Sequence, residues 1–401
     1  MITTDDTWTW RQAAALCVAV VGAAALAQVS SPGTTVVLPA LPWGIVIAAI
    51  PALIVFVIGL LWPRQAFFAG LGSVHLAACA LVACMILAIP AAIWPQGTAA
   101  PEALQRFGFH QVFESLPFAA AAALIACNLS MACARRLRLI GFEPDFIATH
   151  LGLLIVIITA AGGSGSFLRG RVTLHEGAPP NALVLAHDGI RSAHLSAGLQ
   201  LDDFVLEYWE PELRLVSGAT HHRSQRQALE PGTKIALGST HIRVQRYLSL
   251  CAVVAGVPQA FGQPGALPAL EVTVSDSQGK QLAQGWLHAG GPFGEALYLP
   301  CGEAGTLVME APKARRFASH LRVHRADGVE SVVLEVNQPL RLSGGWWLYQ
   351  TGYDEKLGAA SRTSIIEAVR DPAYPGIMAG ALLLLLGVFG GLIRISREDQ
   401  A

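Results

Sequence analysis

Two histidines of the chain lie in long apolar stretches, where ionisable side chains are costly. His150 lies near the start of FIATHLGLLIVIITAAGGSG, and His75 lies within GLGSVHLAACALVACM. A neutral imidazole can ligate a metal ion without carrying a charge into lipid. The same side chain can instead lie at a helix end as an interfacial residue, or hydrogen-bond between packed helices. Residue type alone leaves these alternatives open, although an ionisable group inside a membrane calls for a functional hypothesis.

The polar part of the chain contains the residue types found in enzymes and metal sites, but without the spacing those sites need. It has no HExxH, zinc-type Cys/His spacing, GxSxG, P-loop or dinucleotide-binding glycine motif, and no CxxC or CxxCH. His320 and His324 would share a strand face with Arg322 between them, which is typical of a solvated polar face. GGSGSFLRG follows the end of a predicted apolar helix and does not precede the start of one, so it is not a phosphate-binding loop at a helix N-terminus. We therefore predict a protein that is not an enzyme.

The elements that position these residues follow from the distribution of charge. Only 14% of the 401 residues are charged, against about a quarter in soluble domains. A helix needs about 20 apolar residues to cross the hydrocarbon core, and a charge at its centre costs about 2.5–3.5 kcal/mol. The long charge-free runs therefore predict a membrane protein with a multi-span α-helical bundle. The six predicted spans are residues 12–31, 42–62, 66–94, 116–134, 148–166 and 375–393.

The placement of arginine predicts the orientation of these spans. With the N-terminus in the cytoplasm, the short outside loops carry only Arg106, which satisfies the positive-inside rule. The leader MITTDDTWTWR is acidic, which favours retention of the first span over cleavage after ALAQ. A net charge of −1 gives nucleic-acid binding no electrostatic support. The inside segments then carry Arg11, Arg64, Arg135, Arg136, Arg138, Arg394 and Arg397.

Residues 167–374 then form a large extracytoplasmic region whose pattern is that of an all-β domain. KIALGSTHIRVQRYLSL, LEVTVSD and SVVLEVNQPLRL carry apolar residues at alternate positions. SDSQGK and RADGVE are typical of hairpin turns, and PQAFGQPGALP of a loop. Cys251 and Cys301, the two cysteines of this region, can form a disulfide in an oxidising compartment, and the sequence does not decide whether they do.

Several stretches, taken in order, resemble the ResB family, the membrane subunit of System II cytochrome c biogenesis. The resemblance begins near residue 66 and implies a three-helix core of ResB type (65–166), the extracytoplasmic β domain (167–374) and a last helix with a short tail (375–401). Residues 1–64 add two helices that the usual four-span pattern lacks. The similar stretches are AIPAAIWPQG, FGFHQVFESLPFAAAAALIACNLSMACARRL, THLGLLIVIITAAGGSGSFLRGRVTLHEG, LQLDDFVLEYW and VNQPLRLSGGWWLYQTGYD.

The resemblance implies a haem-handling subunit of the cell (inner) membrane. Such a subunit acts with a ResC/CcsA-type partner to carry haem across the membrane for attachment to the CxxCH thiols of apocytochrome c. The haem would be of b type, bound transiently and without a covalent bond. The resemblance implies that His150 is the axial ligand of the haem iron, and His75 is the second candidate for this ligand. Arg135, Arg136 and Arg138 are candidates to pair with the haem propionates, although topology alone would also demand these charges.

The β domain would dock the partner or the apocytochrome. Trp346, Trp347 and Tyr349 are the candidate contacts, and core packing or an interfacial aromatic belt is the alternative explanation of these side chains. The alternative function is that of a membrane-anchored scaffold whose β domain binds partner proteins without touching haem. A small-solute transporter is less favoured, because the spans lack paired charges and an evident inverted repeat.

Overall fold

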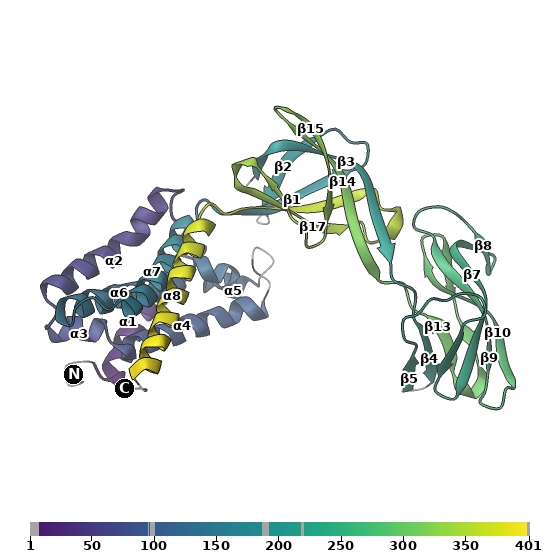
Figure 1. Cartoon of the computed structure of the whole chain (residues 1–401), viewed down its shortest axis with the longest axis horizontal. Coiled ribbons are helices and arrows are strands. Elements are labelled where there is room, and N and C mark those ends of the chain that lie inside the picture. Colours follow the sequence, from purple (N-terminus) through teal and green to yellow (C-terminus); the bar gives the residue numbers. More distant parts are fainter. Residues whose placement is uncertain (1–7, 95, 97–100, 187–191, 218–219, 399–401) are drawn as a thin grey trace. The chain divides into compact units, whose positions relative to one another are not determined.

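The structure, a computed structural model of the whole chain, describes residues 8–94, 96, 101–186, 192–217 and 220–398 (Figure 1). The chain divides into two compact units. The helical unit contains the described residues up to Arg169 and from Val369 onward, and the β unit contains those between Gly170 and Ala368.

Six helices in the described part of the chain are long and apolar enough to cross a membrane. The prediction of a multi-span helical membrane protein that also carries a large all-β region is therefore confirmed at this level. The six helices are α1 (Trp10–Ser30), α2 (Trp43–Leu61), α4 (Val74–Ile93), α6 (Leu116–Leu139), α7 (Pro144–Gly163) and α8 (Tyr374–Glu398).

The third predicted span, residues 66–94, is broken in the structure. A short helix, α3 (Ala66–Leu71), ends at Gly72, and α4 begins after Ser73, whose hydroxyl accepts a hydrogen bond from the Leu76 amide at 3.3 Å. Glycine and serine are poor helix formers, and the break frees backbone carbonyls. The buried Asn128 amide of α6 donates to the carbonyls of Leu71 at 2.8 Å and Ser73 at 2.9 Å. His75 consequently lies in the first turn of α4, not deep within a span.

The two N-terminal helices are integral to the bundle. Ala13 and Cys17 of α1 are buried in one cluster with residues of α4, α6 and α7. The backbone amides of Leu38 and Leu41, in the segment between α1 and α2, donate to the hydroxyls of Ser164 at 3.1 Å and Ser166 at 2.8 Å. A side chain at Gly162 would place its Cβ 2.5 Å from the Ile45 Cα. The glycine-serine stretch at the end of α7 thus permits close backbone approach.

Helices α7 and α8 pack antiparallel along a glycine-lined contact. A Cβ on Gly380 would lie 2.8 Å from the Gly152 carbonyl oxygen, and a Cβ on Gly376 would lie 2.8 Å from the Thr159 Cγ2. Small residues let membrane helices approach until their backbones touch, which replaces the hydrophobic driving force that lipid cannot supply. At the start of α7 the contact ends in an ion pair of 3.0 Å between Arg394 and Asp145.

The β unit contains an eight-stranded antiparallel sheet that coils until β15, at one edge, approaches β17, next to the other edge (Figure 1). Its interior is apolar apart from Gln350, Ser319 and Ser364, which hydrogen-bond to one another. The strand order is β15 (Gly328–Glu335), β14 (Ala314–Arg325), β3 (Ser192–Tyr208), β2 (Asn181–Ala186), β1 (Leu168–His175), β18 (Thr363–Arg370), β17 (Trp346–Tyr353) and β16 (Leu340–Leu342).

Residues 213–309 form a two-sheet sandwich inserted between β3 and β14. Alternate residues of the two sheets face one another in a single apolar cluster, which includes Leu215, Val272 and Leu307. One sheet contains β12 (Leu299–Pro300), β13 (Thr306–Met309), β4 (Leu213–Ser217) and β5 (Thr220–Arg223). The other contains β11 (Gly294–Leu297), β10 (Gln281–Gly291), β9 (Leu267–Ser275), β7 (Thr240–Val254) and β6 (Lys234–Leu237), with β8 (Val257–Ala260) paired to β7.

Cys251 and Cys301 are free, buried thiols of this sandwich and do not form the disulfide considered above. Burial raises the pKa of Cys251 to about 11 and also raises the pKa of Cys301. Since the unfolded chain releases these protons near pH 9.0, unfolding releases protons above that pH and stability falls as pH rises toward 11.

We expect both thiols to resist iodoacetamide at pH ~8 and to react fully in urea. Mass spectrometry of the two peptides measures this, and rapid labelling of the folded protein would contradict it.

Candidate functional site

Several contacts bring residues from different helices together at one end of the bundle, here called the His150 end. Asp145 at the start of α7 pairs with Arg394 near the end of α8. Trp10 at the start of α1 lies edge-to-face against His75 at the start of α4, with ring centroids 4.6 Å apart. Arg135, near the end of α6 that leads into α7, donates to the Ala69 carbonyl at 3.1 Å, just before α4, so both membrane histidines belong to the same end of the helical unit. The opposite end, where α7 meets the α1–α2 segment, is called the Ser164 end.

The His150 ring is half-buried and held by two contacts within its own helix. Its Nδ1 lies 2.9 Å from the Phe146 carbonyl oxygen, one turn earlier in α7. Because a carbonyl only accepts hydrogen bonds, Nδ1 carries the proton and Nε2 of the neutral ring keeps its lone pair. The ring also stacks on Phe146, with centroids 3.9 Å apart and planes inclined by 23°. Nε2 hydrogen-bonds to no residue within the described part of the chain.

Arg136 extends this stack from the neighbouring helix. Its guanidinium lies over the Phe146 ring, 4.9 Å from the centroid. Its Nε donates to a Glu143 carboxylate oxygen at 2.7 Å, and a second guanidinium nitrogen forms an ion pair with the same oxygen. The charge of Arg136 is therefore compensated within the α6–α7 connection, and this arginine already has a carboxylate partner.

The other two arginines of the predicted cation group have different environments. Arg135 donates to the carbonyl oxygens of Pro63 at 2.9 Å and Ala69 at 3.1 Å. It therefore satisfies backbone carbonyls that the ends of α2 and α3 leave without helical partners. Arg138 is exposed and pairs with no carboxylate among the described residues. Of the three arginines, only Arg138 is available to an anionic ligand without breaking an existing contact.

This difference predicts opposite results for two otherwise similar substitutions. Arg135→Ala removes charge-assisted hydrogen bonds to two carbonyls, so we expect a loss of about 3 kcal/mol in stability. Arg138→Ala removes an exposed charge and should leave stability within about 0.5 kcal/mol of the parent. The check is the temperature at which the detergent-solubilised protein loses its monodisperse elution peak. Equal midpoints for the two variants would contradict the role given to Arg135.

The three aromatic residues proposed as partner contacts do not share one face of β17. Trp346 is only 2% exposed and points into the eight-stranded sheet with Leu348, so it is a core residue and cannot contact a partner. Trp347 and Tyr349 are each 37% exposed on the outer face. Arg341 of the neighbouring strand β16 lies over the Trp347 ring, 5.5 Å from its centroid. The outer pair alone stays available for docking.

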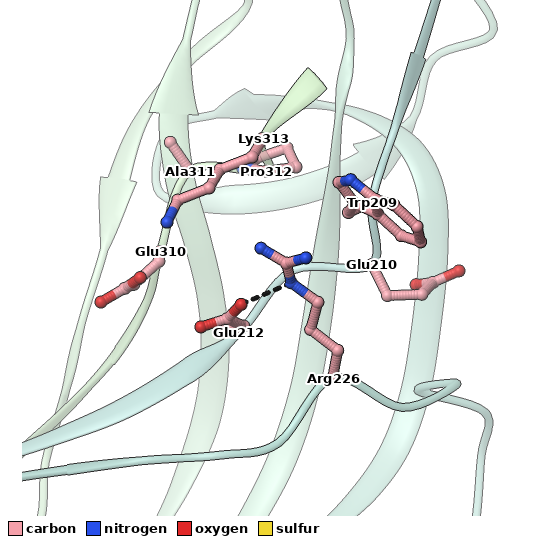
Figure 2. Close-up of a pocket in the computed structure, with 8 residues that line it drawn as sticks. All are labelled: Trp209, Glu210, Glu212, Arg226, Glu310, Ala311, Pro312 and Lys313. Carbon is pink, nitrogen blue, oxygen red and sulfur yellow. Dashed lines mark hydrogen bonds and ion pairs between the residues drawn. The ribbon is translucent and has the colours of Figure 1, made fainter. Parts of the chain in front are cut away.

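A recess that the sequence did not suggest lies where the chain passes between the eight-stranded sheet and the inserted sandwich. Two connecting segments, 209–212 and 310–313, are joined by backbone hydrogen bonds from Trp209 N to Lys313 O at 2.9 Å and from Glu310 N to Glu212 O at 2.8 Å. Together with Arg226 they line a small open recess, in which Trp209 faces the charged side chains (Figure 2). No sequence motif marks this site, because its residues become neighbours only when β3 pairs with β14.

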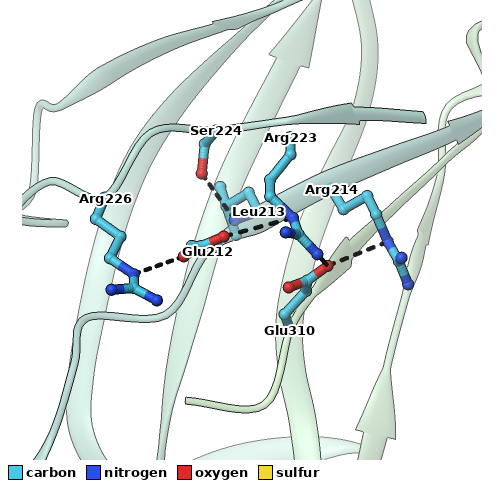
Figure 3. Close-up of polar contacts among 7 residues, drawn as sticks. All are labelled: Glu212, Leu213, Arg214, Arg223, Ser224, Arg226 and Glu310. Carbon is cyan, nitrogen blue, oxygen red and sulfur yellow. Dashed lines mark hydrogen bonds and ion pairs between the residues drawn. The ribbon is translucent and has the colours of Figure 1, made fainter. Parts of the chain in front are cut away.

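Two of the three carboxylates beside this recess, those of Glu212 and Glu310, are bonded to arginines of the sandwich (Figure 3). Glu212 accepts from Arg226 at 2.6 Å and lies 3.4 Å from Arg223. Glu310 pairs with Arg223 at 2.8 Å and with Arg214 at 3.4 Å. Glu212 and Glu310 therefore belong to a network in which each of these two carboxylates has two cationic neighbours.

Within the described residues, no three His, Cys, Asp or Glu side chains are grouped to hold a metal ion. A metal centre at the His150 end would therefore take few ligands from this chain. The fold defines the class as a multi-pass membrane protein with a large all-β unit. No protein-family model matches the chain, and no curated protein matches it.

Proposed function

We propose that this protein is a haem-handling membrane subunit for the maturation of c-type cytochromes. The observation that carries the proposal is the state of His150, whose Nδ1 is occupied by the Phe146 carbonyl and whose Nε2 has no partner among the described residues. Histidines that ligate metals commonly donate their second nitrogen to a carbonyl in this way, which fixes the tautomer and orients the ring. The resemblance of the sequence to the ResB family supplies the identity of the group.

The residues at the His150 end fit a haem in part. His150 would hold the iron through Nε2, and Phe146 would keep the imidazole plane fixed through the stack. Arg138 would pair with a propionate, whereas Arg135 and Arg136 are already occupied. The bound haem supplies the porphyrin that is to be joined to the CxxCH thiols of apocytochrome c. His75, whose ring packs on Trp10, remains the second candidate ligand.

Orientation follows from the same end of the bundle. Arg64, Arg135, Arg136 and Arg138 lie at or next to helix ends on the His150 side, and Arg394 joins them through its ion pair with Asp145. By the positive-inside rule, the N-terminus and the His150 end would lie at the cytoplasmic leaflet of the inner membrane. The β unit would lie on the extracytoplasmic side, where apocytochrome c receives haem.

The proposal includes two protein partners. A ResC/CcsA-type membrane subunit would provide a second axial ligand, since this chain groups no further ligands around His150 among its described residues. Apocytochrome c or that subunit would dock on the outer face of β17, through Trp347 and Tyr349. Exposed aromatic side chains on a rigid strand are the residue types that interfaces favour.

The test is the absorption spectrum of the complex purified with its partner subunit in mild detergent. We expect a Soret band in the parent complex and a loss of most of that band in His150→Ala, since the variant removes the nitrogen that would hold the iron. His75→Ala, measured in parallel, tests the second candidate ligand, because it removes the other membrane histidine at the same end. A colourless parent complex, or an unchanged band in His150→Ala, would contradict the proposal.

The scaffold function stays the second candidate, and one observation favours it. Trp347 and Tyr349 are exposed on a strand whose alternate residues Trp346, Leu348 and Gln350 pack inward, so the β unit offers a docking face that requires no haem. Under this alternative, His150→Ala would leave cytochrome maturation intact, whereas changes on the β17 outer face would abolish it.

A further inference from the structure

Trp209 is an aromatic side chain that neither core of the β unit uses. It lies at the end of β3, 43% exposed, beside the recess of Figure 2. Arg226 of the sandwich and Arg315 of β14 both lie over its ring, with centroid distances of 5.3 Å and 5.2 Å. A guanidinium stacked on an indole keeps its N–H groups free to donate in the ring plane. The stack therefore restrains the Arg315 guanidinium beside Trp209 and leaves its N–H groups available.

Two cations at this place lack a carboxylate partner among the described residues. Arg315 makes the stacking contact and no ion pair, and the Lys313 ammonium makes none. Both side chains are exposed. Their arginine neighbours differ, since Arg226 pairs with Glu212, and Arg316 pairs with both Glu207 and Glu335. Lys313 and Arg315 therefore place two cations without an ion pair next to an exposed tryptophan, and Glu210 of the same recess hydrogen-bonds to Tyr247.

We propose that Trp209, Lys313 and Arg315 form a docking site for an acidic peptide segment of a partner protein. A carboxylate can take two parallel N–H bonds from the Arg315 guanidinium, and a second carboxylate can pair with Lys313. An apolar side chain of the same peptide can cover the exposed edge of Trp209. Trp and Arg are the residues that most often dominate binding energy at protein interfaces. This site is separate from the haem proposal and does not depend on it.

The shape and charge of the recess favour a peptide over an anionic lipid surface. Glu210, Glu212 and Glu310 line the same recess. A bilayer presents a continuous layer of phosphates, which would be repelled by these carboxylates. A peptide can place its acidic residues on Lys313 and Arg315 alone, and can offer backbone N–H groups to the glutamates. Charge complementarity of this kind sets partner choice and association rate.

The experiment measures binding of a fluorescein-labelled peptide of alternating glutamate and alanine to the full-length protein in nanodiscs of zwitterionic lipid. The readout is fluorescence anisotropy, and the reference probe replaces each glutamate with glutamine. Lys313→Glu/Arg315→Glu is the test variant. Lys234→Glu/Arg243→Glu is the matched control, because these two exposed cations are cross-strand neighbours on β6 and β7 and change the net charge equally. Trp209→Ala tests the aromatic platform, and thermal melting verifies that each variant is folded.

We expect the glutamate peptide to bind more tightly than the glutamine peptide. The test variant should weaken that binding by at least about tenfold, Trp209→Ala should weaken it by about threefold or more, and the control should change it by less than about twofold. Equal losses in the test and control variants would show bulk electrostatics and overturn the proposal. Absence of a preference for the glutamate peptide would overturn it too. The proposal would also be overturned if Lys313→Glu/Arg315→Glu changed the sedimentation of the protein with phosphatidylglycerol vesicles and left peptide binding unchanged.

Discussion

Replacing Gly152 with leucine is expected to prevent α7 and α8 from packing and to remove the protein from the membrane fraction. A Cβ at Gly152 would lie 2.7 Å from the Gly380 carbonyl oxygen and would also overlap with the Leu384 backbone nitrogen. Both atoms belong to helix backbone, so neither can rotate away. Overpacking costs about 1–3 kcal/mol where side chains can adjust, and here the helices themselves must separate. We therefore expect a cost at the upper end of that range or beyond it.

The measurement is the yield and elution profile of a fluorescent fusion in mild detergent. Gly22→Leu is the matched control, because Gly22 lies in α1 and a Cβ there would meet no atom within 4 Å. Gly22→Leu should accumulate as the parent does, while Gly152→Leu should be degraded or elute as an aggregate. Similar profiles for the two leucine variants would contradict the α7–α8 packing.

The second large effect concerns cytochrome maturation. In cells that carry only the His150→Ala variant, we expect haem-stained c-type cytochromes to fall to about a tenth of the parent level or lower, since even the loss of a residue that supports a metal ligand costs about 10–100-fold. Phe146→Leu keeps the backbone carbonyl that accepts from His150 Nδ1 and removes only the stacking ring, so its effect should be smaller. Haem staining of membrane proteins separated by electrophoresis provides the measurement.

A second variant separates this function from that of a scaffold. Trp347→Ala/Tyr349→Ala changes the outer face of β17 without touching the buried Trp346. Normal cytochrome levels in His150→Ala, together with their loss in Trp347→Ala/Tyr349→Ala, would contradict haem handling by this chain and favour the scaffold.

The helices of the helical unit could be predicted well from the sequence. A charged side chain is costly in lipid, so a membrane-spanning helix has a long run without charged residues, and few other structures have such runs. The break near Gly72 could not, since it depends on Asn128, which lies on another helix and supplies the hydrogen bonds that make the break tolerable. The contact of the Ser164 end with the α1–α2 segment could not be predicted either, because its two sides are far apart in the sequence. The glycine-serine stretch marks a close approach, but the approaching backbone is more than a hundred residues away.

In the β unit, alternation predicted strands and both hairpin turns. The turns at SDSQGK and RADGVE join β9 to β10 and β14 to β15. The insertion of the sandwich was not predicted, because alternation says which face of a strand is buried and not which sheet the strand joins. Trp346 and Trp347 illustrate this limit, since adjacent residues point to opposite faces and only the pairing decides which face is the interior.

The sequence predicted one residue of the candidate site, His150, but not the contacts that surround it. His150 attracts attention because an ionisable side chain is rare in an apolar stretch. The partners that fix its ring, the Phe146 carbonyl and the Phe146 ring, follow from the four-residue spacing of a helix. The engagement of Arg135 with Pro63 and Ala69 could not be read from the sequence, because it depends on where α2 and α3 end.

The most direct test of the central claim is chemical rescue of His150→Gly, purified with its partner subunit and supplied with free imidazole. If the iron is held by this ring, the Soret band should be weak in the variant, should return as imidazole is added, and should not return with an alkyl alcohol of similar size. A variant whose spectrum equals that of the parent before any imidazole is added would contradict the assignment of His150 as the haem ligand.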